Sequence, residues 1–110
     1  MTNTILDLDR VAEIQASAMY QAAAAKFLAT AQRMVQQGKG WAPSARKVWI
    51  SDLCAEMGTT VERYAEVLVA WNNLGLLQLT RADLVGAMDP AKVRASQIEC
   101  QGSTFNFVVV

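Results

Sequence analysis

Apolar residues recur at steps of three and four positions through the first third of the chain, which is the spacing of one face of a helix. The segment from Leu8 to about Gln37 contains no Gly or Pro and is rich in Ala, Gln, Met and Leu, all of which favour helices. This pattern predicts one long helix, with or without a break. The apolar stripe consists of Val11, Ile14, Ala18, Ala22, Ala25, Leu28, Ala31 and Val35.

The first half of this stripe is rich in alanine, whereas larger side chains begin at Phe27 and Leu28. Small side chains let helices approach closely but bury little apolar area. We therefore expect residues 1–26 to form a helical extension that pairs with a second copy in a homodimer. Residues 27–110 are expected to form the domain itself. The candidate dimerisation residues are Val11, Ile14, Ala18, Ala22 and Ala25.

Short elements separated by glycine follow this helix. Residues 38–40 (Gly-Lys-Gly) end it, and a β-like run comes next at residues 47–50. Ser51 is expected to cap a short helix over residues 52–57, and Gly58 to end that helix.

A longer helix is predicted after this glycine. Thr59 is expected to cap it, with Glu62 three residues later completing a capping box. The helix should run to about Asn73 and end at Gly75, before an extended apolar segment at residues 76–79.

The last third of the chain changes from helical to alternating patterning. Residues 81–88 are expected to form a helical turn or two, and Asp89-Pro90 to start another helix with Pro at its first position. Apolar residues then alternate with polar ones on both sides of Gly102-Ser103, which predicts a tight hairpin with Gly at the first central position. The alternating apolar residues are Ile98, Cys100, Phe105, Phe107 and Val109. The predicted fold class is therefore mainly α with a small antiparallel sheet (α+β).

Composition narrows the possible functions. The 110 residues are 53% hydrophobic and 18% charged, which fits one folded domain with its own core. The chain has no His, so the commonest metal ligand and the commonest general acid or base are both missing. We expect no catalytic residues, no metal and no cofactor, and hence a protein that is not an enzyme.

The amino-terminal residues and the lack of a long apolar segment predict the cellular location. Asp7, Asp9 and Arg10 interrupt any apolar core of an export signal, and no window approaches the ~20 apolar residues of a membrane span. We expect a cytoplasmic protein without membrane contact. Cys54 and Cys100 are expected to be reduced rather than joined in a disulfide.

The net charge is zero, but the charges are unevenly distributed along the chain. Residues 14–51 contain five cations and no carboxylate, whereas residues 1–13 carry −2 and residues 52–110 carry −3. A carboxylate-free block suggests an anionic partner. The alternative is a surface that uses Gln instead of charged pairs for solubility.

The order of the predicted elements resembles a winged helix-turn-helix domain. The resemblance covers residues 27–110, and its most specific part is ISDLCAEMGTTVERYAEVLVAWNNLGLLQL. In that segment small, apolar and turn residues fall at the offsets of a helix-turn-helix: Leu53, Ala55, Gly58, Val61 and Leu68. The sequence departs from a minimal winged helix at residues 81–96, which form an insertion before the hairpin.

The resemblance implies a transcription-regulatory protein that binds double-stranded DNA with the helix 60–73 and the basic region 33–47. Its wing tip would be residues 101–104, which carry no charge. We call the positions of this helix that would face a duplex the reading face: Thr59, Thr60, Glu62, Arg63, Glu66, Val67 and Ala70. The candidate DNA-contacting residues are Arg33, Lys39, Arg46, Lys47, Thr59, Thr60 and Arg63. The reading face holds one cation against two acids, so the alternative is a winged helix used as a protein-interaction or dimerisation module.

Overall fold

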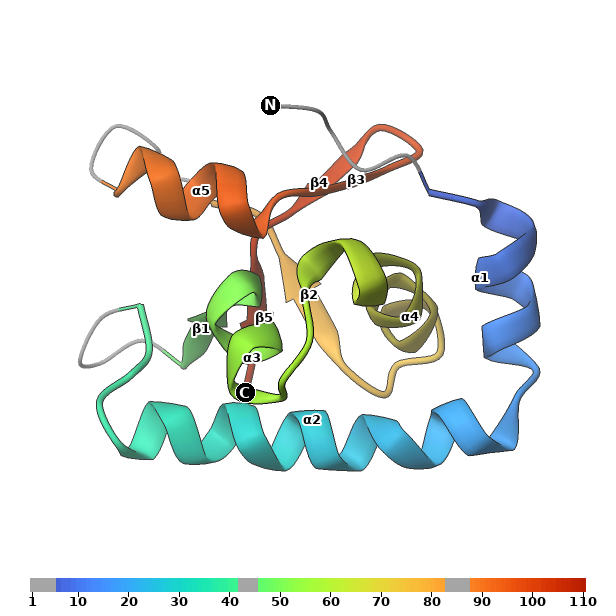
Figure 1. Cartoon of the computed structure of the whole chain (residues 1–110), viewed down its shortest axis with the longest axis horizontal. Helices are drawn as coiled ribbons and strands as arrows, with labels where there is room; N and C mark the ends of the chain where they lie inside the picture. Colours follow the sequence, from blue (N-terminus) through green and yellow to red (C-terminus); the bar gives the residue numbers. More distant parts are fainter. Residues whose placement is uncertain (1–5, 42–45, 83–87) are drawn as a thin grey trace.

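The computed structural model describes residues 6–41, 46–82 and 88–110 (Figure 1). In chain order the elements are α1 (Leu8–Gln15), α2 (Ala18–Gln36), β1 (Lys47–Trp49), α3 (Ile50–Glu56), α4 (Val61–Asn73), β2 (Gln78–Thr80), α5 (Pro90–Ser96), β3 (Ile98–Cys100), β4 (Ser103–Phe105) and β5 (Phe107–Val109). This confirms the predicted α+β class with small antiparallel sheets. No helix in these ranges is long and apolar enough to cross a membrane. Most of the helical turn predicted at 81–88 lies outside the described residues.

The strands form two small antiparallel sheets. The first has the order β1-β5-β2, with Val108 opposite both Val48 and Leu79. The second is the β3-β4 hairpin, which lies at the top of Figure 1, away from α2. The helices surround the first sheet, with α2 along one side of the molecule and α5 near the opposite side (Figure 1).

The predicted hairpin is present, but its turn lies one residue earlier than expected. Cys100 pairs with Ser103, so the two central residues are Gln101 and Gly102. Their φ values of 50° and 85° are both positive, as in a type I′ turn, and Gly therefore occupies the second central position.

The predicted long helix is broken into α1 and α2. Ala16 remains helical, whereas Ser17 is extended, with φ −94° and ψ 115°. The Ser17 side chain accepts a 3.5 Å hydrogen bond from the Tyr20 amide and so caps α2. The break turns α1 across the end of α2 and lays it beside α4 (Figure 1).

This bend changes the role of the first residues. Val11 and Ile14 are buried in the same apolar cluster as Phe27 and Trp71. In the single chain, Val11 and Ile14 pack against the chain's own core and present no surface to a second copy. The predicted domain boundary after residue 26 falls inside α2, and residues on both sides of it contribute to one core.

Two of the predicted helix caps are displaced. Thr60, not Thr59, caps α4, and its hydroxyl accepts from the Arg63 amide at 3.2 Å. Ser51 lies inside α3 and caps nothing; instead its amide donates to the buried Ser96 hydroxyl at 3.0 Å. The predicted start of α5 is correct, because Asp89 caps it and Pro90 is its first residue.

The predicted ends of α3 and α4 are confirmed. Gly58 and Gly75 each follow the last turn with φ +75°, a conformation that costs glycine little. The next amide then closes each end at 2.9 Å, from Thr59 to the Cys54 carbonyl and from Leu76 to the Trp71 carbonyl.

A buried asparagine interrupts what the alternating pattern predicted as one strand. Asn106 is 2% exposed and lies between β4 and β5. Its backbone amide donates to Thr80 and its carbonyl accepts from Ile50, at 2.8 and 3.0 Å. Its side chain accepts from the Ala82 amide and donates to the Val93 carbonyl, both at 3.0 Å. Asn106 thus joins the first sheet to α3, to the segment after β2 and to α5.

Candidate interaction surfaces

α1 is bound to α4 by apolar and polar contacts. Val11 and Ile14 supply the apolar part, since both belong to the main core cluster. The Asp7 amide donates to Glu66 Oε2 at 2.6 Å, and Arg10 Nε lies 3.4 Å from Glu66 Oε1. Glu66, a member of the predicted reading face, is therefore engaged within the chain.

The same contact continues toward the end of α4. Asn73 Nδ2 donates to Gln15 Oε1 at 3.1 Å. Glu66, Ala70 and Asn73 are spaced by four and three residues, so all three lie on the face of α4 that meets α1. Ala70 is fully buried and Val67 is 2% exposed. The prediction that Val67 and Ala70 are accessible to a duplex is wrong, because intrachain packing covers them.

The amino-terminal turn of α4 remains open. Thr60, Glu62 and Arg63 are exposed, and Thr59 is half-buried. The Thr60 hydroxyl is already used as the helix cap. The exposed part of the predicted reading face is thus one turn with one cation and one acid.

Several predicted DNA-contacting cations have partners inside the chain. Arg33 Nη2 lies 3.2 Å from Glu56 Oε2, and Arg46 Nε donates to the Val110 carbonyl at 3.0 Å. Both arginines are exposed, so these contacts are partly screened by solvent. They nevertheless show that cations of the carboxylate-free block contact a carboxylate and a backbone carbonyl from other parts of the chain.

Lys47 is held over aromatic rings. Its Nζ lies 5.8 Å from the centroid of Trp41 and 5.2 Å from that of Phe107, within the range of a cation–π contact. Phe107 in turn contacts Trp49, with ring centroids 4.3 Å apart and the rings tilted by 34°. Trp49 and Phe107 belong to a small second apolar cluster, and Trp41 packs against it. The three aromatic side chains therefore serve in packing.

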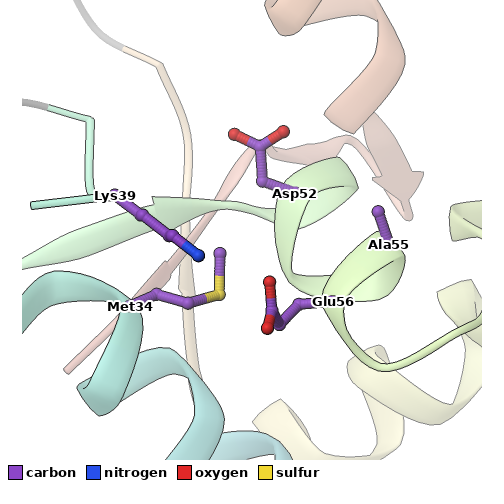
Figure 2. A pocket seen from close by; sticks show the side chains of 5 residues that line it. All are labelled: Met34, Lys39, Asp52, Ala55 and Glu56. Carbon is purple, nitrogen blue, oxygen red and sulfur yellow. The ribbon is translucent and has the colours of Figure 1, made fainter. Parts of the chain in front are cut away.

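Lys39 lines a surface pocket of about 370 Å³ with Met34, Asp52, Ala55 and Glu56. Figure 2 shows the Lys39 side chain reaching from the segment after α2 toward the two carboxylates of α3. Asp52 is also bonded to Lys92 of α5. The pocket therefore has mixed charge. In the described ranges no three His, Cys, Asp or Glu side chains gather as metal ligands would.

Both cysteines are free thiols. Burial raises the pKa of Cys54 from 9.0 to about 12, because desolvation disfavours the thiolate. Cys54 therefore stays protonated at neutral pH, which is the unreactive state of a packing residue.

The outer face of α2 carries three exposed alanines among longer side chains. The remaining candidate dimerisation residues, Ala18, Ala22 and Ala25, are exposed, and Met19 is 78% exposed. A dimer through these alanines stays a prediction.

Two features of these surfaces were missed from the sequence, namely the contact between α1 and α4 and the buried Asn106. The ion pair between Arg10 and Glu66 joins residues far apart in the chain, and no local spacing indicates it. Comparisons with protein-family models, curated proteins and solved structures found no match for the chain.

Proposed function

We propose that this chain is a winged-helix module that acts through protein contacts, with self-association as its main activity, and that it does not read DNA. The observation that carries the proposal is the position of α1 on the face of α4. A winged helix that reads DNA presents that face of the equivalent helix to the major groove.

The order of elements supports the winged-helix part of the proposal. α2, β1, α3, α4 and β2 follow one another, and β5 returns to lie between β1 and β2. The segment between β2 and β5, which holds α5 and the β3-β4 hairpin, stands where a wing would be. Fold alone does not assign a function, so the choice between DNA binding and protein contact depends on the charges and exposure of the surface residues.

The charges support the protein-contact part. A duplex carries one negative charge per ~1.7 Å of axis and favours a surface with many unpaired cations. Here Arg33 pairs with Glu56, and Lys39 shares a pocket with Asp52 and Glu56. Arg63 is the exposed cation on the open turn of α4, and the acid Glu62 precedes it.

DNA binding is the second candidate, and one observation favours it. Arg63 and Thr60 are exposed at the amino end of α4, where a helix entering the major groove makes its first contacts. This arrangement would allow shallow contact with a duplex edge while α1 stays in place.

Fluorescence anisotropy with a labelled duplex at about 50 mM salt tests the proposal. We expect no tight binding, and any weak binding should fall equally in Arg63→Ala and in the control Arg94→Ala, which removes an exposed arginine of α5. Salt-dependent binding that Arg63→Ala weakens at least tenfold and Arg94→Ala leaves intact would overturn the proposal in favour of DNA recognition.

A further inference from the structure

We propose that α1 is exchanged between two copies of the chain, so that α1 of each copy packs on α4 of the other. In this dimer α1 and α2 form one continuous helix. The inference rests on the proposed self-association and names the surface that carries it.

The hinge between α1 and α2 is two residues long, Ala16 and Ser17. Ala16 stays in the right-handed helical region with ψ −8°, and the large departure is the ψ of 115° at Ser17. Rotation of this ψ to its helical value, with smaller adjustments of the neighbouring angles, would join the two helices. Exchange of an element between copies needs a change at the hinge alone, because the interface itself is the same in both states.

The sequence around the hinge favours the continuous helix. Ala16, Ser17 and Ala18 contain no Gly or Pro, and alanine is the strongest helix former. In the bent form the Tyr20 amide makes only a long 3.5 Å bond to Ser17 Oγ. A continuous helix would give this amide, and those of residues 18 and 19, carbonyl partners four positions earlier.

Straightening breaks two contacts that hold the bend. Arg10 Nη2 donates to the Tyr20 hydroxyl at 3.2 Å, and Gln21 Nε2 donates to the Gln15 carbonyl at 2.7 Å. Both donors, Arg10 and Gln21, are exposed, and the acceptor residues Gln15 and Tyr20 are half-buried, so water can replace both bonds. The loss of these two hydrogen bonds therefore adds little to the free-energy difference between the bent and straight forms.

Straightening moves α1 away from its own α4. Residues 8–36 as one helix would span about 44 Å at 1.5 Å per residue. Val11 and Ile14 would then leave their own core and expose the Ala70 face of α4. The α1 helix of an identical chain fits that face, because the contact is the one already formed within a single chain. Exchange in both directions gives a dimer with two-fold symmetry.

A pair of substitutions at neighbouring positions separates the two forms. Ala18→Pro suits the bent form, because residue 18 is the first of α2 and Ser17 already has the extended conformation required before proline. Proline at 18 cannot continue a helix from α1. Ser17→Ala removes the cap of α2 and improves the helix propensity of the hinge.

Sedimentation equilibrium over a protein concentration series measures the effect. We expect a dimer of the native chain, a dimer dissociation constant roughly tenfold lower in Ser17→Ala, and a folded monomer in Ala18→Pro. A native chain that stays monomeric at every concentration, or an Ala18→Pro variant that dimerises as the native chain does, overturns the exchange.

A cross-linking test gives a readout that does not depend on the hinge variants. Gln15→Cys with Asn73→Cys puts one thiol on each of the two facing helices, at positions whose longer native side chains touch at 3.1 Å, in a Cys100→Ser background. After reaction of the purified dimer with a short bifunctional maleimide, exchange predicts chains joined in pairs on a denaturing gel. Cross-links formed only within single chains contradict exchange. They leave the proposed function standing, because DNA binding tests that separately.

Discussion

At the scale of single residues, buried polar groups determine how the parts of this chain are held together. Asn106 uses both backbone groups and both side-chain atoms for partners in four different segments. A buried polar group without a partner is costly, so each of these bonds constrains where its segment can lie. The alternation of residues 103–109 places Asn106 on a polar face and gave no sign that it would be buried.

Replacement of Asn106 should therefore be strongly destabilising. Asn106→Ala leaves the buried Ala82 amide and the half-buried Val93 carbonyl without a side-chain partner, and we expect a loss of about 2–4 kcal/mol in the free energy of unfolding. Asn73→Ala, which removes one exposed bond to Gln15, is the control and should cost less than about 1 kcal/mol. Chemical denaturation measures both. Equal losses of unfolding free energy in the two variants would contradict the importance of the Asn106 side-chain hydrogen bonds for stability.

The two thiols should differ sharply in reactivity. A thiol-specific reagent at about pH 8 should label the half-buried Cys100 and leave Cys54 unreacted until denaturant is added. The unfolded thiol loses its proton above about pH 9, whereas the folded one keeps it to about pH 12. Burial of Cys54 therefore contributes stability that is complete below pH 9 and declines between pH 9 and 12. Rapid labelling of Cys54 in the folded Cys100→Ser variant would contradict this.

At the scale of elements, local signals predicted most helix and strand positions and several helix ends, but not which elements pack together. Asp89-Pro90 starts α5 and Gly75 ends α4 as expected, because caps and terminal glycines act within a few residues. The position of the break was not predicted, because Ser17, which caps α2, lies between two alanines that favour a helix. In the bent chain Val11 and Ile14 are buried in the core cluster.

The two adjacent threonines before α4 provide a test of cap assignment. Thr60→Ala should lower the free energy of unfolding by about 1 kcal/mol, because it removes the hydroxyl that accepts from the Arg63 amide. Thr59→Ala is the matched control and should have a smaller effect, since no cap bond depends on it. Thermal or urea unfolding of both variants compares them, and a larger loss in Thr59→Ala would restore the capping box predicted from the sequence.

At the scale of the whole molecule, charges that are separated in the sequence are mixed in space. The block from residue 14 to 51 has no acid of its own, yet Arg33 meets Glu56 and Lys39 faces the carboxylates of α3. Net charges of sequence blocks could not predict this, because α3 folds back onto α2. The cations of the candidate DNA site could therefore be listed from the sequence, but their partners in space could not.

The position of α1 on α4 is the feature from which both proposals follow. It fills the face that a DNA-reading winged helix needs, and it supplies an element that a second copy can receive. While α1 of the same chain or of a second copy lies on this face, the face is closed to a duplex.

Sedimentation velocity of the full chain mixed with a fluorescent duplex at about 50 mM salt tests this directly. We expect the protein to sediment as a dimer and the duplex to sediment as it does alone. A duplex that moves with the protein at low salt and separates from it as salt is raised, with the protein itself monomeric, would contradict the proposed function.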